Sequence, residues 1–127
     1  MSDILERGSA WLNEQRIRHL SRPVTYWRGE SSAQVQAAVG KTVFEVDNGE
    51  GVLESFESRD FLIRTVDLVL NDEKVLPKRG DRIREEQDGM AYVYEVMAPG
   101  SEQPYQLDRY RRTLRIHTKL VETEEGT

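Results

Sequence analysis

The sequence predicts a mainly β domain, a small antiparallel β-sandwich or barrel of about seven strands with an N-terminal α-helix. Three observations lead to this fold class. From residue 23 onward, short stretches alternate apolar and polar residues with a period of two. Glycine, proline, Asn-Gly and Asp-Gly signals separate these stretches. Residues 3–20 follow a helical period instead. We expect the 127 residues to form a single domain, with a β body over about 23–121.

The expected helix over 3–20 begins with a plausible capping pair, Asp3 and Glu6. Its apolar stripe consists of Ile4, Leu5, Gly8, Trp11 and Leu12. After Leu12 the stripe weakens, because Gln15 and His19 occupy its centre and Ile17 points the opposite way. Two interpretations stay open: a helix docked along its first three turns, or a segment that orders fully only against a partner.

Alternating patterns predict the first strands at 24–28, 34–39, 42–47, 51–58 and 59–65, with Gly40 as an interruption. Asn48-Gly49 favours a two-residue hairpin, because both residue types tolerate a positive φ. That turn would place Phe44 opposite Leu53. It would also place Asp47 opposite Glu50, a like-charge pair that a longer loop would relieve.

We expect a helical turn around 66–70, packed by Leu68 or Leu70, and then a surface loop ending at Pro77. The next residues, Arg79-Gly80-Asp81, match a short adhesion motif of extracellular proteins. We interpret them as a turn whose charges serve solvation and strand register.

Strands over 81–86 and 91–97 should follow, joined by Asp88-Gly89. A two-residue turn there places Ile83 opposite Tyr94 and Arg82 opposite Glu95.

Residues 98–110 are expected to form a long connection, and 111–120 a final strand. In that strand Leu114, Ile116 and Thr118 share one side, and Arg115, His117 and Lys119 share the other. The acidic residues 122–127 are expected to be disordered.

Charge and composition weigh against several classes of function. A net charge of −5 argues against a protein whose main task is to grip nucleic acid. The chain has no cysteine, no run of 18 apolar residues and no signal-peptide-like start, so we expect no thiolate chemistry, no membrane span and no export. We expect structural or surface roles for His19 and His117, and a hairpin at 47–51 in preference to a calcium loop. We therefore predict no catalytic, cofactor or metal site, and no enzyme.

Aromatic residues and one basic cluster are the candidates for binding. Core packing is the favoured account of the aromatics, with base stacking as the alternative: Trp11, Trp27, Tyr92, Tyr94, Tyr105 and Tyr110. The arginines at 109, 111 and 112 are either a solvated strand entry or a dock for an acidic protein partner. We predict that partner contacts are made by Trp11, Ile17, Tyr105, Arg109, Arg111 and Arg112.

The stretch "DFLIRTVDLVLNDEKVLPKRGDRIREEQDGMAYVYEVM" combines an apolar strand, an aspartate-leucine turn, a proline before the Arg-Gly-Asp turn and a charged hairpin. With the ending "YRRTLRIHTKLVE", it resembles the head–tail joining (tail-attachment) proteins of long-tailed bacteriophages and prophages. The resemblance covers roughly residues 60–121; the N-terminal half matches only in layout.

This resemblance implies a structural protein of the virion neck, which assembles in the bacterial host cytoplasm into a ring between the portal complex and the tail. Copies would be monomeric or weakly associated in isolation. Their partners would be one another, portal or adaptor proteins and the tail terminator, and DNA would pass through without sequence-specific binding. Whether it acts as adaptor, stopper or terminator stays open. An alternative of another class is a small β-barrel module that binds single-stranded nucleic acid or another polyanion.

Overall fold

The computed structural model describes residues 20–47, 49–98 and 103–125. Most of them lie in β-strands, so the mainly β prediction is confirmed. The strands are β1 (Arg22–Arg28), β2 (Ser31–Asp47), β3 (Leu53–Arg64), β4 (Val69–Leu70), β5 (Glu73–Lys74), β6 (Arg82–Gln87), β7 (Met90–Val96), β8 (Tyr105–Leu107) and β9 (Thr113–Glu125). The expected N-terminal helix lies outside the described residues, apart from residue 20.

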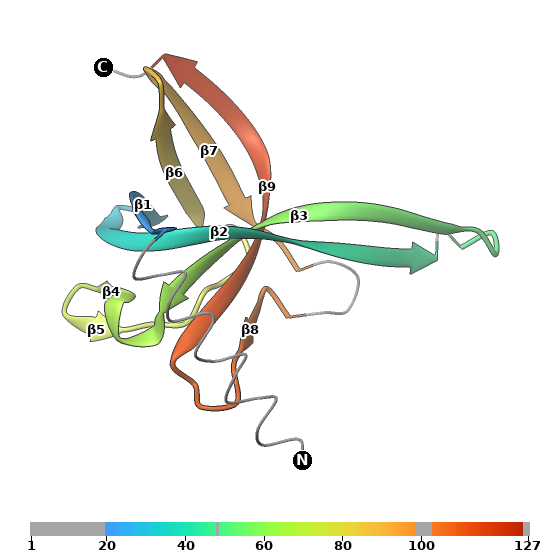
Figure 1. Cartoon of the computed structure of the whole chain (residues 1–127), viewed down its shortest axis with the longest axis horizontal. Helices are drawn as coiled ribbons and strands as arrows, with labels where there is room; N and C mark the ends of the chain where they lie inside the picture. The colour runs from blue at the N-terminus through green and yellow to red at the C-terminus, as the bar shows by residue number, and fades with distance from the viewer. Residues whose placement is uncertain (1–19, 48, 99–102, 126–127) are drawn as a thin grey trace.

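Six strands pair in a closed antiparallel ring, in the order β3-β2-β1-β6-β7-β9, with β9 returning to β3. The ring closes because β9 is long: Thr113–Thr118 pairs with β3, and Thr118–Glu125 pairs with β7. β8 pairs beside β9, and β4 and β5 form a small sheet of their own (Figure 1). Of the two architectures predicted, this pairing is a barrel.

Alternate residues of the barrel strands point inward and build the main apolar core, beside which Ala38 and Leu62 form a small separate cluster. The fully or nearly buried members are Val24, Tyr26, Val35, Ala37, Phe61, Ile63, Ile83, Tyr94, Val96, Leu114 and Ile116. Leu68 and Leu70 join them. The helical turn predicted around 66–70 is a short 3-10 helix at Thr65–Asp67, and Leu70 belongs to strand β4 instead. The predicted inward side of the last strand is confirmed, since Leu114, Ile116 and Thr118 are all buried.

The predicted β6–β7 register is confirmed. Ile83 pairs with Tyr94, and Arg82 pairs with Glu95 at 3.7 Å between guanidinium and carboxylate. Asp88 and Gly89 both have a positive φ, as a tight hairpin turn requires.

The Arg-Gly-Asp turn is confirmed as well. Gly80 has a φ of 95°, and its N–H donates to the carbonyl of Val96 at 2.9 Å. One part of that interpretation is wrong: the Asp81 side chain is buried and takes no part in solvation.

The predictions for 34–65 need three corrections. Gly40 does not interrupt β2, and the strands expected at 51–58 and 59–65 are one strand, β3. Phe44 pairs with Phe56 instead of Leu53, so the loop spans 48–52 and avoids the like-charge pair. The two rings stack at 5.4 Å, and the Asp47 carboxylate accepts the Gly49 N–H at 2.8 Å; together these contacts favour the longer loop over the two-residue turn.

We call residues 41–58 the arm, because there β2 and β3 run beyond the barrel and form a hairpin that projects from it (Figure 1). β1 pairs with β2 only as far as Ala37, and β9 pairs with β3 only from Arg59. Within the arm, each strand of the hairpin is therefore paired with the other strand alone.

The C-terminal prediction is also corrected. Residues 122–125, expected to be disordered, continue β9 and pair with β7. Glu122 and Glu124 lie 3.7 Å from the guanidinium groups of Arg82 and Arg84, so acidic residues that looked like a solvated tail complete a strand. The predicted connection 98–110 contains β8, and residues 99–102 lie outside the description. No helix in the described part of the chain has the length and apolar character needed to cross a membrane.

Candidate assembly surfaces

Asp81 is the first of three buried carboxylates that fix the barrel. The Tyr26 hydroxyl donates to it, and so does the Arg28 guanidinium at 2.9 Å. The backbone N–H of Lys78 donates to the same carboxylate at 2.9 Å. Burial and the hydrogen bond to Asp81 raise the pKa of Tyr26 far above its usual range, which keeps the phenol neutral. Asp81, the aspartate of the adhesion-like tripeptide, is thus buried and fully hydrogen-bonded within the fold.

Glu85 is the second buried carboxylate and lies between two arginines. Arg22 donates to it at 2.8 Å and Arg59 at 2.7 Å. The Arg59 guanidinium also lies over the Tyr94 ring, 5.1 Å from its centroid. The next residue, Glu86, is exposed, because neighbouring residues of a strand point to opposite faces of the sheet.

Asp60 is the third and lies at the root of the arm. Thr42 and Ser58 donate hydrogen bonds to its carboxylate, and Arg115 approaches at 2.8 Å. His117 Nδ1 lies 3.0 Å from the same group. Burial by itself raises the pKa of Asp60, but the hydrogen bonds outweigh it and lower the pKa to about 2. The carboxylate is therefore ionised at any ordinary pH.

Ser58, Asp60 and His117 are the residue types of a hydrolytic triad, but their geometry is different. A nucleophilic serine must contact its base, whereas here Ser58 and His117 both contact the same Asp60 oxygen. All three side chains are at most 2% exposed, so a substrate has no access to them. His117 is a satisfied structural histidine. On the side of the strand expected to be polar, His117 is buried, Arg115 is partly buried and Lys119 is exposed.

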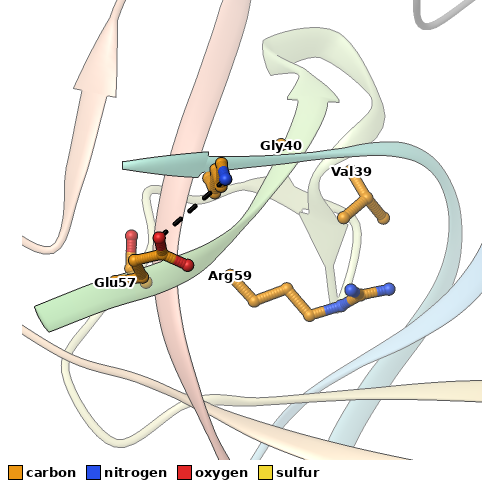
Figure 2. Close-up of a pocket in the computed structure, with 6 residues that line it drawn as sticks. Val39, Gly40, Glu57 and Arg59 are labelled. Atoms are coloured by element: carbon orange, nitrogen blue, oxygen red, sulfur yellow. Dashed lines mark ion pairs between the residues drawn. The ribbon is translucent and has the colours of Figure 1, made fainter. Parts of the chain in front are cut away.

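A hollow of about 510 Å³ lies where the arm leaves the barrel, lined by Val39, Gly40, Lys41, Glu57, Ser58 and Arg59 (Figure 2). Lys41 and Glu57 form an ion pair at 3.9 Å, and both side chains are well exposed. Such a pair contributes about 0–1 kcal/mol. The Arg59 guanidinium is already committed to Glu85. Within the described residues, neither this hollow nor any other cluster gathers three side chains suited to a metal ion.

The arm is strongly acidic. Residues 41–58 include five carboxylates and one lysine. Its side chains are mostly exposed, including Val43 and Leu53. The Phe44 ring stacks on Phe56 and meets the edge of His117 at 5.0 Å, so the root is held while the tip extends.

The β8–β9 connection presents the basic cluster, and we call residues 109–112 the arginine turn. The Asp108 carboxylate accepts the N–H of Arg112 at 2.7 Å, and Arg111 adopts a φ of 56°. The Thr65 hydroxyl donates to the Arg111 carbonyl at 2.8 Å. The Arg112 guanidinium lies over the Tyr110 ring at 5.8 Å. The backbone of the arginine turn is therefore held by hydrogen bonds, and its arginine side chains are exposed.

The structure brings together only some of the predicted contact residues. Arg109, Arg111 and Arg112 are neighbours on one exposed turn. Tyr105 is half-buried in β8 and packs against the core. Trp11 and Ile17 lie outside the described residues. The arm was absent from that prediction; its signal was the run of acidic residues between 45 and 57.

The aromatic stacking platform, which was the alternative to core packing, does not form in the described part of the chain. Tyr94 is buried, Tyr92 and Tyr105 pack against the core, and only Tyr110 accompanies the arginines. Core packing accounts for these first three, as expected, but that expectation is wrong for Trp27 and Tyr110, each of which is 39% exposed.

The fold and surfaces define a small β-barrel with internally paired buried charges, an acidic arm and a basic turn. The chain belongs to the phage head-tail joining protein family, whose model matches residues 2–125. No curated protein matches the chain. It is a structural bacteriophage protein that acts between other head and tail proteins, in the neck of the virion.

Proposed function

We propose that copies of this chain form a ring in the virion neck, between the portal complex and the tail, and that the ring is a scaffold without catalytic chemistry. The arm is the observation that carries the proposal: two strands leave the barrel with their outer edges unmatched by the barrel's own strands. Open strand edges pair readily with another chain. The three buried carboxylates are all satisfied internally, which supports a rigid body presenting surfaces.

The ring would hold its copies through heterologous contacts that close by rotation. Free copies are expected to be monomeric or weakly associated in the host cytoplasm and to order fully on assembly. The contact residues proposed for neighbours and for portal, adaptor or tail-terminator proteins are Trp11, Ile17, Tyr105, Arg109, Arg111 and Arg112. DNA would pass without sequence-specific binding, since the net charge of −5 disfavours retention.

The direct test mixes purified protein with tailless, DNA-filled heads and with free tails of the phage that encodes it. We expect the protein to bind the heads and to make them competent to accept tails, scored by electron microscopy and by infectivity. Protein that binds neither heads nor tails would contradict the proposal. Titration with single-stranded DNA at two salt concentrations tests the alternative, a module that binds a polyanion. We expect no binding, whereas binding that weakens steeply with salt would favour the alternative.

A further inference from the structure

Opposite charges are concentrated on two separate projections of the molecule. The arm, with five carboxylates and one lysine, accounts for four of the chain's five net negative charges. The arginine turn places three arginines within four residues. Both are exposed, and each has a backbone fixed by its own hydrogen bonds.

These two projections do not face each other within one molecule. Figure 1 shows the tip of the β2–β3 hairpin extending to one side of the barrel, while the β8–β9 turn lies at the base of another side. The Asp60 cluster and the Phe44–Phe56 stack hold the root of the arm in its direction. The carboxylates at the tip therefore point toward whatever lies beside the barrel.

We propose that the acidic arm of one copy binds the arginine turn of the next copy. This inference deepens the proposed ring and rests on it. The contact is heterologous, since arm meets turn and never arm meets arm, and repeating such a contact gives a ring when the rotation between copies closes. Arginine suits this partner, because its planar fork matches carboxylates in bidentate geometry.

The negative charge of the arm indicates which partner it binds. A strongly acidic hairpin is repelled by DNA, and two arms repel each other. The complementary basic surface exists on every neighbouring copy. The backbone edge of β3 before Arg59 adds an attachment point of its own, because β9 pairs only beyond it.

Charge reversal tests the contact. The arm variant is Glu45→Arg with Glu57→Arg, and the turn variant is Arg111→Glu with Arg112→Glu. Both variants should fold, as circular dichroism would verify. The two arm glutamates are exposed, and the backbone hydrogen bonds of the turn do not require the arginine side chains. The self-association of free copies is expected to be weak, so it is measured by sedimentation velocity at high protein concentration and at low salt, where exposed charges are least screened.

We expect either variant alone to associate at least about tenfold more weakly, because like charges then meet. A chain carrying all four reversals should recover most of its self-association. The matched controls are Lys78→Glu with Arg79→Glu, and Glu30→Arg with Glu73→Arg, exposed residues away from both surfaces. These controls should associate like the unaltered chain.

A second measurement uses the absence of cysteine. A chain with Ser55→Cys and Tyr110→Cys, treated with a short bis-maleimide, should give a ladder of linked copies. Either cysteine alone should give at most dimers.

The proposal is overturned if all four reversals together associate no better than either pair, or if the double-cysteine chain gives no ladder. Binding of the arm to a head or tail protein would appear as reversals that block joining while leaving self-association unchanged. Failure of the broader function is distinguishable: the unaltered chain would then not join heads to tails, while sedimentation and crosslinking would still decide the contact.

Discussion

The barrel and the arm are built from the same two strands but have opposite character. On one face of β2, Val35 is 5% exposed and Ala37 is fully buried, yet Val43 on the same face is 56% exposed. The less exposed side of the strand also changes: odd-numbered residues are the buried ones in the barrel, whereas in the arm the even-numbered residues, Phe44 among them, are partly buried and the odd-numbered ones are exposed. Val43 is exposed because the opposing wall of the barrel ends before it. Burial, and the stability that comes with it, is therefore a property of closure, and the part of the hairpin beyond closure remains available for contacts.

Phe61→Ala should produce the largest loss of stability. Phe61 is fully buried in the barrel, and removing such a ring lowers the free energy of unfolding by about 3–5 kcal/mol. Chemical denaturation measures the change. Val43→Ala on the arm is the matched control and should change it by less than about 0.5 kcal/mol. Equal effects at the two positions would break the comparison between barrel and arm.

Asp81→Ala should produce the second largest loss of stability. The free energy of unfolding should fall by about 3 kcal/mol, because the substitution leaves Arg28 and the Tyr26 hydroxyl without their buried partner. Arg79→Ala, two residues away and exposed, should be almost neutral. Thermal unfolding of the two variants compares them directly. A larger loss for Arg79→Ala would mean that the tripeptide is more than a turn.

Asp60 should make the root of the arm sensitive to acid. Its folded pKa of about 2 lies below its ordinary value of 3.8, so the stability that its carboxylate supplies is complete above pH 4. About 2 kcal/mol of it should be lost as the pH falls from 4 to 2. Unfolding free energies of the wild type and Asp60→Asn, measured across that window, should converge at low pH. If the difference between the two unfolding free energies stayed constant with pH, Asp60 would not be the source of the acid sensitivity.

Shortening the arm should have the smallest effect on stability and a large one on assembly. Residues 45–55 can be replaced by Asn-Gly, because Phe44 and Phe56 already face each other as a hairpin closure requires. The free energy of unfolding should change by less than about 1 kcal/mol. Tail joining to DNA-filled heads should fall at least about tenfold if the arm is a contact surface. Unchanged joining would leave the arm without a function.

Local signals carried some predictions and misled others. The β6–β7 register followed from Asp88-Gly89 because a two-residue turn fixes every pair beyond it. The same logic failed at Asn48-Gly49, where the Phe44–Phe56 stack outweighs the local turn preference. Residues 122–125 looked disordered because their composition is polar, yet backbone pairing with β7 and ion pairs to Arg82 and Arg84 order them.

One candidate surface is visible in the sequence and the other is not. Three arginines within four residues are visible as a basic cluster without any structure. The arm is not, because the acidic run from 45 to 57 becomes a projection only when β1 stops at Ala37 and β9 begins at Arg59. The carboxylate clusters were missed because Asp60 and Arg115 are 55 residues apart in the chain.

The sequence by itself determined the β class, the inward and outward alternation, the Arg-Gly-Asp turn and the resemblance to head-tail joining proteins, since each depends on near neighbours or on linear order. Only the tertiary structure decided that the sheet closes, that three carboxylates are buried against arginines, and that one hairpin extends past the barrel. Those features depend on strand pairings between distant residues, and pairing across a closed sheet is a property of the whole chain.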